Sequence, residues 1–514
     1  MIGRRAWAAY AVVFVASAAT LVLEIAAGRL LASYFGVSLY TWTSIIGVVL
    51  AGISVGNYLG GIVADLAGDR RTLGLVLATA GMASLGILPF TTINLLGLVP
   101  QGLPVVARMV LVTALLFFAP SALLGMVSPL VVKLTLADLE RVGHVVGRIY
   151  AWSTLGSIAG TLLTGFVLIP WVGTRSVIFG VGVVLIALAA VTGEFFRRSG
   201  WPRRVDIALV LLLCLNLAQI HVGGALQNWC YRETGYYCIR VTTEREKDGY
   251  EYRVLSLDHL IHSYNSIEDP RRLNYPYIRT YAALTAYAAD RTPRLRALFI
   301  GGGGYTMPRY MEATYPDAVL EVAEIDPGVT ATATEMLGLS PATRVVTFNR
   351  DAREVVEAKQ GTATYDLVFG DAFNDYQIPY HLTTREFAQK VKNLLAPRGL
   401  YLALVIDRMR GGRFMASVVR TLQEVFPHVY VLSDVPGTRI PQARTYVVAA
   451  SADALDVDQV RRLPSLGPDG ETTVGVMPPE AMAEWLREAD PVVLTDDYAP
   501  ADNLMAPIFL ERGF

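Results

Sequence analysis

The sequence is poor in cysteine and histidine, and its first two-fifths are poor in charge. Its 514 residues include only three cysteines, Cys214, Cys230 and Cys238, and six histidines. Three cysteines at these spacings build neither a disulfide scaffold nor a zinc site. The composition therefore excludes a small disulfide-rich secreted domain, and we expect no metal centre.

Charge is distributed unevenly along the chain. Residues 1–222 carry 14 basic and 7 acidic side chains, whereas residues 223–514 carry 30 basic and 38 acidic ones. This division excludes a single soluble globule and a disordered chain. The acidic second part also argues against nucleic acid as a partner, because nucleic-acid binders present basic surfaces.

Long apolar runs fill the first part. A membrane-spanning helix needs about 20 mostly apolar residues, and the first run is too long, and too closely followed by another, for a cleaved signal peptide. The sequence therefore predicts that 1–222 form an all-α polytopic membrane bundle of about seven helices, with lipid as a partner. The expected spans are 7–31, 40–63, 73–93, 105–132, 149–170, 175–194 and 205–222.

Basic residues gather in alternate loops, which places the N-terminus in the cytoplasm by the positive-inside rule. Seven crossings then put the C-terminal part outside the cytoplasm, and a disulfide between Cys230 and Cys238 would fit that oxidising side. If the run 105–136, interrupted by Pro120 and Pro129, crossed twice, the C-terminal part would be cytoplasmic. We favour the extracytoplasmic side of a multi-pass cell-membrane protein. The basic residues are Arg4, Arg5, Arg70, Arg71, Lys133, Arg141, Arg148, Arg197, Arg198, Arg203 and Arg204.

Two features inside the spans bear on function. Glycines recur every fourth residue in 52–60 and 156–160, which favours close helix packing and is compatible with a transport path. Glu24 is an acid inside a span. It either receives a cationic substrate or pairs with Arg29 or Arg108.

From residue 223 onward the pattern is that of an α/β domain. Runs 236–245 and 250–257 flank a Lys-Asp-Gly turn, which signals a β-hairpin, and we assign 223–270 to a small β-hairpin piece. In 271–514 strands and helices alternate, which predicts a doubly wound, mainly parallel Rossmann-like sheet of the methyltransferase type. The expected strands are 295–300, 319–323, 344–348, 365–369 and 399–406, with helices at 275–289, 305–315 and 384–395.

Polar motifs follow four of these strands. A run of glycines, Gly301–Gly304, follows the first strand, and Glu324, Asp351 and Asp371 follow the next three. Ligands bind beyond the carboxyl ends of such strands, and glycine lets the backbone approach a ligand closely. An acid after the second strand can accept both hydroxyls of a ribose, and one after the third can accept from an adenine amino group. The order of these motifs predicts a nucleoside pocket.

Residues 236–435 resemble the spermidine synthase (polyamine aminopropyltransferase) family, and the whole chain resembles the branch in which membrane helices precede that domain. The resemblance implies a transferase, usually a homodimer, that passes the aminopropyl group of decarboxylated S-adenosylmethionine to an amine such as putrescine. The segments that carry it are 257–263 (Leu-Asp-His-Leu-Ile-His-Ser), Gly301–Gly304, 324–326 (Glu-Ile-Asp), 351–352 (Asp-Ala) and 371–374 (Asp-Ala-Phe-Asn).

Site residues carry over by position. The resemblance makes Asp371 the catalytic acceptor of the amine proton, since an ammonium must lose a proton before it attacks carbon. It makes Glu324 the ribose-binding acid and Asp351 the adenine-binding acid. The implied cofactor-binding residues are Gly301, Gly302, Gly303, Glu324, Asp326, Asp351 and Ala352. The implied substrate-binding residues are Tyr237, His262, Tyr275, Asn374, Asp375, Asp496 and Asp497.

Departures from the family pattern lie on the amine side. Gly304 replaces an acid of the glycine loop, Tyr275 opens a Tyr-Pro-Tyr run where the family has Tyr-His-Glu, and Tyr237 takes the place of a glutamine. Asn374 replaces the last acid of an Asp-x-x-Asp loop. The acids of 496–502, with Tyr277 and Tyr305, either rebuild a cation site with cation–π attraction or form a solvated loop.

Three functions follow from this pattern. The first is a membrane-bound aminopropyltransferase with an open choice of small-molecule amine. The second is an S-adenosylmethionine-dependent methyltransferase on the same fold. The third is a transporter or sensor that binds a nucleoside without turnover. His381 is either a catalytic residue or part of the approach to the next helix.

Overall fold

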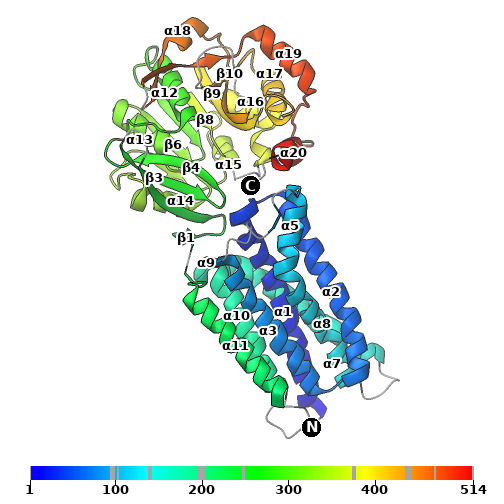
Figure 1. The fold of residues 1–514 in the computed structure, drawn as a ribbon. Coiled ribbons are helices and arrows are strands. Elements are labelled where there is room, and N and C mark those ends of the chain that lie inside the picture. The colour runs from blue at the N-terminus through cyan, green and yellow to red at the C-terminus, as the bar shows by residue number, and fades with distance from the viewer. Residues whose placement is uncertain are drawn as a thin grey trace. The chain divides into compact units, whose positions relative to one another are not determined.

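The structure is a computed structural model of the chain. It divides into two compact units, 1–235 and 236–512, and each is described by itself (Figure 1). The residues that the structure describes are 2–92, 99–100, 103–136, 142–193, 203–227, 229–245, 249–372, 378–433, 443–467 and 470–511.

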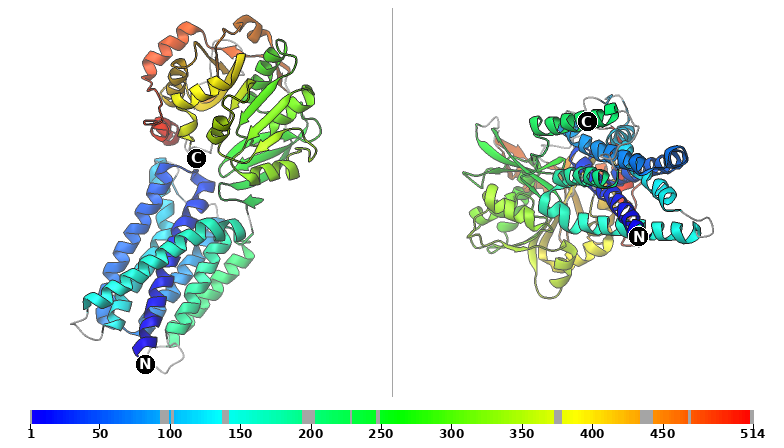
Figure 2. Two further views of the ribbon diagram at one scale, coloured as in Figure 1. Left: turned by 180° about the vertical axis from the view of Figure 1, so that it is seen from behind. Right: turned by 90° about the horizontal axis from the view of Figure 1, so that it is seen from below.

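The first unit consists of helices that pack side by side (Figure 2). Six described stretches are long and apolar enough to cross a membrane, and the apolar part of α11, 207–222, is shorter. The predicted all-α N-terminal unit is thus confirmed, and among its described helices six, not the predicted seven, are long and apolar enough to span a membrane. Its elements are α1 (Ile2–Phe35), α2 (Leu39–Ala67), α3 (Arg70–Thr92), α5 (Val105–Thr113), η1 (Ala114–Phe118), α6 (Ala119–Gly125), α7 (Val127–Thr135), α8 (Val142–Leu163), η3 (Thr164–Leu168), α9 (Ile169–Val172), α10 (Thr174–Thr192) and α11 (Arg203–Val222).

Glycines allow two pairs of helices to approach closely. A Cβ atom on Gly56 of α2 would overlap the carbonyl oxygen of Ala122 in α6, and one on Gly156 of α8 would overlap that of Phe14 in α1. Backbone-to-backbone contact of this kind is how small residues stabilise helix pairs in lipid. The glycine repeats are therefore explained by packing.

The order of contacts along α2 fixes the course of the fourth span. Gly52 faces Ser121, and Gly60 lies against Met126. The contacts advance along both segments together, so α2 runs parallel to the stretch from α5 to α7. That stretch therefore runs through the unit in one direction, along a single path.

Contacts at the end of α1 show where the chain leaves this unit. Arg29, near the end of α1, donates a hydrogen bond to the Thr234 carbonyl oxygen at 2.9 Å. Arg175, at the start of α10, donates to the Ala225 carbonyl oxygen at 2.9 Å. Residues 225–234 therefore lie at the end of the unit opposite to Ile2. Cys230 and Cys238 are both disulfide-bonded, whereas Cys214 is free.

The second unit begins with a β-meander. Strand β2 (Cys238–Arg245) pairs antiparallel with β3 (Glu251–Leu257), which confirms the predicted hairpin. Strand β3 pairs in turn with β4 (Leu260–Ser266), with an irregularity at Leu255 and Ser256. The strand β4 carries the His262 and Ser263 side chains, and the sequence pattern did not predict it. A two-residue strand, β1 (Arg232–Glu233), precedes the meander.

An eight-stranded mixed sheet forms the centre of this unit. Its order is β14-β10-β11-β9-β8-β5-β6-β7. Strands β9, β8, β5, β6 and β7 are parallel, β11 is antiparallel to both β9 and β10, and β14 is antiparallel to β10. This confirms the predicted Rossmann-like sheet. The strands are β5 (Arg296–Ile300), β6 (Val319–Ala323), β7 (Val346–Phe348), β8 (Tyr365–Gly370), β9 (Leu395–Arg408), β10 (His428–Ser433), β11 (Ala443–Ser451) and β14 (Gly475–Val476), with β12 (Pro464–Gly467) and β13 (Gly470–Thr473) in a separate hairpin.

Helices cover both faces of the sheet (Figure 1). Phe299 and Phe369 stack on the face covered by α12, with ring centroids 4.6 Å apart, whereas α16 and α17 pack on the other face. Strand β5 lies between β6 and β8, so the chain turns in opposite directions from it and opens a crevice beyond its carboxyl end. The helices are α12 (Pro276–Ala289), α13 (Thr306–Thr314), α14 (Pro327–Met336), α15 (Ala352–Ala358), η4 (Tyr380–Leu382), α16 (Arg385–Leu394), α17 (Phe414–Gln423), α18 (Val457–Arg462), α19 (Pro479–Ala489) and α20 (Ala501–Glu511).

Candidate functional site

The glycine run after β5 makes a turn that needs glycine at two positions. Gly301 has φ +96° and Gly303 has φ +48°, in the left-handed region that residues with a Cβ rarely adopt. A Cβ on Gly301 would overlap the carbonyl oxygen of Asp371, which follows the neighbouring strand β8. The turn therefore brings the ends of β5 and β8 into direct contact.

The Glu324 carboxylate is fixed on this turn. It accepts hydrogen bonds from the backbone N–H groups of Gly302 at 2.9 Å and Gly303 at 3.2 Å, and from Asp326 N–H at 2.9 Å. The side chain is only 6% exposed. Burial raises the pKa of Glu324, and the three backbone donors act in the opposite direction. Oε2 accepts two of these bonds and Oε1 accepts one, so Oε1 keeps a lone pair for a ligand hydroxyl.

The Asp326 side chain, predicted to bind the cofactor, caps a helix instead. Its carboxylate caps α14 by accepting from the Gly328 N–H at 2.8 Å, and it is 1% exposed. It supports the loop that carries Glu324.

Asp351 lies at the start of α15 and contacts His381. Its Oδ1 accepts from the Arg353 N–H at 2.7 Å as an N-cap, and its Oδ2 is hydrogen-bonded to His381 Nε2 at 2.9 Å. Both side chains are about one-third exposed. The histidine, supplied by η4, therefore orients the acid, and one carboxylate oxygen remains near the mouth of the crevice.

Asp371 follows β8 and meets a tyrosine of α12. The Tyr277 hydroxyl donates to Asp371 Oδ2 at 3.1 Å. Burial raises the pKa of Asp371 to about 7, and the tyrosine hydrogen bond offsets only part of that rise. Asp371 is thus half-ionised near neutral pH, which suits a group that accepts a proton during a reaction.

A first cavity, here named the acidic cavity, lies beyond β5, β6 and β7. Glu324, Asp351 and Ala352 line it together with Tyr237 and His381. The structure thus brings together, on one wall, the acids that the sequence placed after successive strands. The remaining lining residues are Tyr236, Leu257, His262, Gly301, Gly303, Ala323, Ile325, Asp371, Ala372, Pro379 and Leu382.

A second cavity, the aromatic cavity, adjoins the first on the α12 face. Tyr275, Tyr277 and Tyr281 line it with Phe299 and Phe369. Successive rings are in edge contact, with centroids 5.1 Å apart for Tyr275 and Tyr277 and 5.6 Å for Tyr277 and Tyr281. The residues that line both cavities are His262, Gly301, Gly303 and Asp371.

His262 sits between the two cavities in its neutral form. Its Nε2 atom is buried with no hydrogen-bond partner among the described residues. Burial lowers the pKa of His262 to about 4. An uncharged imidazole with an unpaired nitrogen is available to a ligand that enters either cavity.

The glycine that replaces the family acid is closely packed. A Cβ on Gly304 would overlap Ser263 Oγ and would lie 3.0 Å from Asn265 Oδ1. Asn265 in turn donates to the Gly304 carbonyl oxygen and to the Leu337 carbonyl oxygen, the latter at 3.0 Å. Side chains of β4 thus occupy the space that a carboxylate at 304 would need.

The proposed replacement acids lie elsewhere. Asp496 pairs with Arg353, whose Nη1 is 2.8 Å from Asp496 Oδ1, and accepts from the Thr384 hydroxyl at 2.7 Å. Asp497 is exposed in a turn. Neither is among the described residues that line the two cavities. Asn374 and Asp375 lie outside the described residues.

Tyr305 also lies outside the cavities. It is fully buried, and its hydroxyl contacts those of Thr330 and Thr347 at 3.0 and 3.2 Å. Sequence reasoning missed Tyr281 and Thr445 in the aromatic cavity. Tyr281 comes one helical turn after Tyr277, a spacing that places both on one helix face and was available as a signal.

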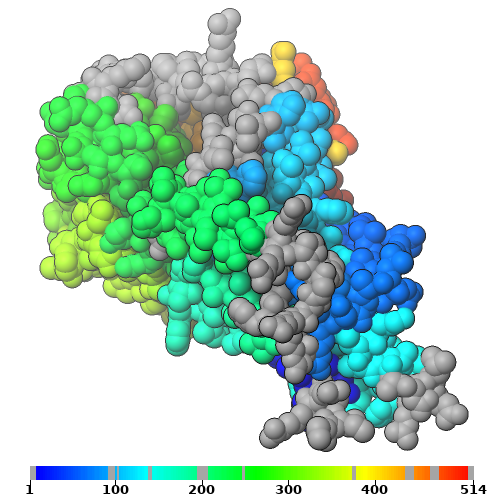
Figure 3. Space-filling view, turned by 60° about the horizontal axis from the view of Figure 1, so that its bottom comes forward, coloured from blue at the N-terminus to red at the C-terminus, as the bar shows by residue number. Residues whose placement is uncertain are grey.

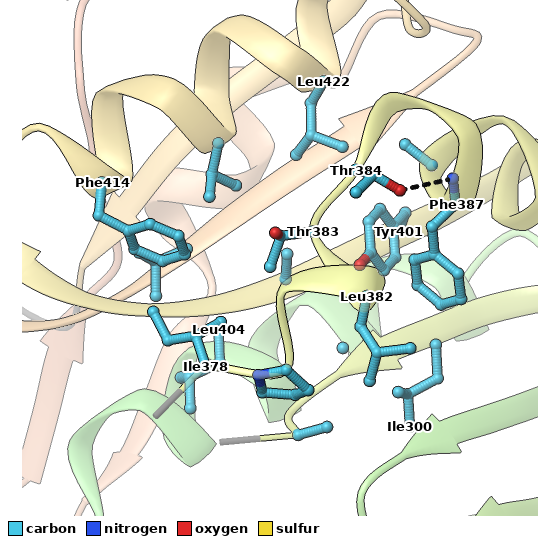
Figure 4. A pocket seen from close by; sticks show the side chains of 17 residues that line it. Ile300, Ile378, Leu382, Thr383, Thr384, Phe387, Tyr401, Leu404, Phe414 and Leu422 are labelled. Carbon is cyan, nitrogen blue, oxygen red and sulfur yellow. Dashed lines mark hydrogen bonds between the residues drawn. The ribbon is translucent and has the colours of Figure 1, made fainter. Parts of the chain in front are cut away.

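A third cavity lies on the opposite face of the sheet, between β9 and helices α16 and α17 (Figure 4). Ile300, Phe387 and Leu422 point into it, and Thr384 accepts there from the Phe387 N–H at 3.2 Å. Its described lining contains no charged side chain. Across the described part of the chain, no three His, Cys, Asp or Glu side chains gather to hold a metal ion.

The sheet order, the glycine turn and the acids at its carboxyl edge define a Rossmann-like domain with a ligand crevice at the point where the strand order reverses. No family model matches the chain. It is 28% identical over 255 residues to a polyamine aminopropyltransferase of Vibrio vulnificus, covering 46% of this chain and 78% of that one. It is 26% identical over 385 residues to one of Corynebacterium efficiens, covering 71% and 70%.

Two further comparisons cover half of this chain or less. An eEF1A lysine and N-terminal methyltransferase of Homo sapiens is 27% identical over 147 residues, covering 27% of this chain and 21% of that one. A crystal structure of a probable spermidine synthase from Corynebacterium glutamicum is 23% identical, with a TM-score of 0.43, and covers 50% of this chain and 93% of that one. The chain is thus similar in sequence to curated polyamine aminopropyltransferases, which are transferases, and this agrees with the predicted resemblance.

Proposed function

We propose that the protein is a membrane-bound aminopropyltransferase that uses decarboxylated S-adenosylmethionine. The observation that carries this proposal is the position of Asp371 on the wall shared by the acidic and aromatic cavities. A donor in one cavity and an amine in the other would meet at this carboxylate. The names of the curated relatives support the same reaction.

The acidic cavity suits the adenosyl part of the donor. Glu324 would accept from a ribose hydroxyl through Oε1, and Asp351 would accept from the adenine amino group. The Gly301–Gly303 turn lets the backbone approach the ligand, because it carries no side chains. Ala352 leaves room beside Asp351 for the base.

The reaction would proceed by displacement at carbon. The amine, deprotonated by Asp371, forms a C–N bond to the methylene next to the sulfonium, the C–S bond breaks, and sulfur keeps the electron pair as a neutral thioether. The proton moves from the amine to Asp371, whose pKa of about 7 suits a base at neutral pH. Tyr277 orients the carboxylate by its hydrogen bond.

The lining of the two cavities distinguishes the donors. A methyl donor keeps its carboxylate and needs a cationic or amide partner for it. Among the described residues no lysine or arginine lines either cavity, whereas Asp371 would repel a second carboxylate. This favours the decarboxylated donor, and the partial likeness to a methyltransferase keeps methyl transfer as the second candidate.

The amine is proposed to differ from a small diamine. Asp371 is the only acid among the described residues of the aromatic cavity, and the other walls are mainly rings and aliphatic groups. The second ammonium of a diamine would lack a carboxylate there, whereas the uncharged remainder of a monoamine would pack on Tyr275 and Tyr281. We therefore propose a primary monoamine as acceptor.

We further propose that the N-terminus is cytoplasmic and that the C-terminal unit is extracytoplasmic. Arg70 and Lys133, two described members of the basic loops, lie at the end where the chain begins, and Arg29 contacts Thr234 at the other end. The disulfide between Cys230 and Cys238 suits an oxidising compartment. A homodimer, which the family resemblance implies, stays a prediction.

Mass spectrometry of reaction products tests the function. The purified full-length protein is incubated with either donor, decarboxylated or carboxylated, and with a panel of monoamines and diamines. We expect a mass increase of one aminopropyl group, only with the decarboxylated donor and lost in Asp371→Asn. A methyl increase with the carboxylated donor would select the methyltransferase, and no product with any pair would contradict turnover.

A further inference from the structure

A polar cavity lies inside the helical unit, between α1, α2, α7 and α8. Hydroxyl and amide side chains from these helices line it, together with Asp65 and Lys133. Such groups are costly in hydrocarbon unless they are hydrogen-bonded or wet. The lining polar residues are Ser17, Thr20, Asn57, Ser128, Ser153 and Ser157.

The hydrogen bonds seen in this cavity leave capacity for water. Ser17 and Ser153 are bonded to each other at 2.7 Å across α1 and α8. Thr20 donates back to the Ala16 carbonyl oxygen at 3.0 Å. Each hydroxyl oxygen still has acceptor sites that face the cavity. The cavity is therefore suited to hold water.

The cavity opens at the end of the unit where the chain begins. Its mouth carries an ion pair between Lys133 Nζ and Asp65 Oδ1 at 2.9 Å, with side chains 50% and 79% exposed. Both residues lie near the C-terminal ends of their helices, which run toward this end. Figure 3 brings that end forward, with α2 in blue and the region of α7 and α8 in cyan.

Glu24 lies one turn further into the unit on the same face of α1. Ser17, Thr20 and Glu24 follow one another at three- and four-residue spacing, so their side chains share one face of the helix. Glu24 is partly buried. Among the described residues none pairs with its carboxylate, and Arg29 donates instead to Thr234. The expected pairing of Glu24 with Arg29 or Arg108 is not observed.

Two π-helical turns pack against α1 near the same depth. They are η1 in the fourth span and η3 in the fifth. Because Gly160 of α8 lies against Ala18, the following turn, η3, lies about level with the Glu24 segment. Insertions of this kind inside helices are frequent at functional sites.

We propose that the cavity is a water-filled vestibule that leads a small organic cation with primary ammonium groups to Glu24. A carboxylate on the same helix face as the Ser17 and Thr20 hydroxyls, one turn beyond the residues that line the cavity, suits an ammonium, which donates three hydrogen bonds. Divalent metal ions require more oxygen ligands than these residues gather. The choice of an ammonium rests on the proposed function, in which both the donor and the acceptor carry one.

Thiol reactivity in nanodiscs tests the vestibule. Full-length protein with Cys214→Ala receives either Ser17→Cys in the cavity or Leu155→Cys on the outer side of α8, where Leu155 is 50% exposed. A membrane-impermeant cationic methanethiosulfonate is the probe. We expect reaction at the cavity position to be about tenfold faster, because thiolates form only where water reaches.

Protection of the Ser17→Cys thiol by an added compound tests which ligand enters the cavity. The primary monoamine butylamine in one arm and decarboxylated S-adenosylmethionine in the other should slow labelling of Ser17→Cys, and the arm that protects identifies which ammonium compound enters. Adding Glu24→Gln should remove the protection, whereas adding Asp371→Asn should leave it intact. Equal rates at the two positions, no protection in either arm, or protection that survives Glu24→Gln would overturn the proposal, whatever the outcome for aminopropyl transfer.

Discussion

The Tyr277 hydroxyl donates its hydrogen bond to Asp371 at 3.1 Å from a helix that precedes the acid by almost a hundred residues. Burial raises the pKa of Asp371, and this hydrogen bond favours the ionised form. The pair thereby determines the pH at which the site can accept a proton. Burial and the Tyr277 hydrogen bond act on that pH in opposite directions.

Tyr277→Phe should shift the acid limb of the profile of kcat/KM against pH to higher pH. Removing a donor to a carboxylate costs about 1.5–3 kcal/mol, which raises the pKa of Asp371 by about one to two units. The profile of kcat/KM against pH, measured with excess amine, would show it. An unchanged acid limb, with the aromatic packing intact by near-ultraviolet circular dichroism, would remove Asp371 as the titrating base.

Asp371→Asn should lower turnover by roughly 10²–10⁴-fold, the usual contribution of a general base, while donor binding by calorimetry stays near that of the wild type. Stability should change in a pH-dependent way. Because burial raises the pKa of Asp371 to about 7, the folded protein binds this proton more tightly than the unfolded chain. The stability it contributes is present below about pH 4 and is lost as the pH rises through 7.

The asparagine variant should therefore have a higher melting temperature than the wild type at pH 8, with the difference vanishing toward pH 4. Asp497→Asn, an exposed change outside both cavities, provides the control. A variant that is less stable at pH 8 would indicate that Asp371 is stabilised as a charge.

Glu324→Gln and Asp351→Ala should each weaken donor binding by about 1.5–3 kcal/mol, the scale for hydrogen bonds that involve a charged group. Calorimetric titration of the full-length protein measures this directly. Because Asp351 also caps α15, its variant is compared with Asp326→Asn, which alters a cap outside the cavity. Wild-type affinity in both site variants would contradict the position of the nucleoside.

Gly304→Asp should destabilise the protein without restoring affinity for a diamine. The new side chain would overlap Ser263 Oγ, and overpacking of this kind costs about 1–3 kcal/mol. Adding Ser263→Gly should recover part of the stability and lower the KM for putrescine relative to a monoamine. Thermal unfolding and the ratio of the two KM values report the two effects. If the Gly304→Asp single variant were as stable as the wild type, β4 would have to move aside next to residue 304.

Cys230 and Cys238 should be unreactive toward a membrane-impermeant thiol reagent in intact cells and should react after a mild impermeant reductant is added. The disulfide explains the first result and the extracytoplasmic side explains the second. Cys214→Ala removes the free thiol as background. Labelling that requires permeabilised cells and no reductant would place the C-terminal unit in the cytoplasm.

Local pattern was enough to predict the sheet and its strand-end acids. Strand β6 matches the predicted 319–323, and Glu324, Asp351 and Asp371 lie where consecutive strand ends meet. These features depend on hydrophobic runs and on residues next to them, which a single sequence displays. The helical unit was predictable for the same reason.

Contacts between distant segments were not predictable. Nothing near Asp496 in the sequence indicates that Arg353 will pair with it, so the acidic loop was interpreted as a possible cation site. Ser263 likewise fills the space beside Gly304 from a strand that the pattern did not reveal. Pairings of this kind depend on tertiary packing, which overrides local preference.

The ion pair between Arg353 and Asp496 ties the tail of the chain to the first turn of α15, where Asp351 is the cap. Thr384, at the start of α16, joins the same group. These contacts thus hold the adenine end of the crevice in place from the C-terminal side. A protease cut near residue 490 would loosen that end without removing any residue that lines the acidic cavity. Truncation of the C-terminal tail should therefore lower the affinity for the donor before it lowers the free energy of unfolding.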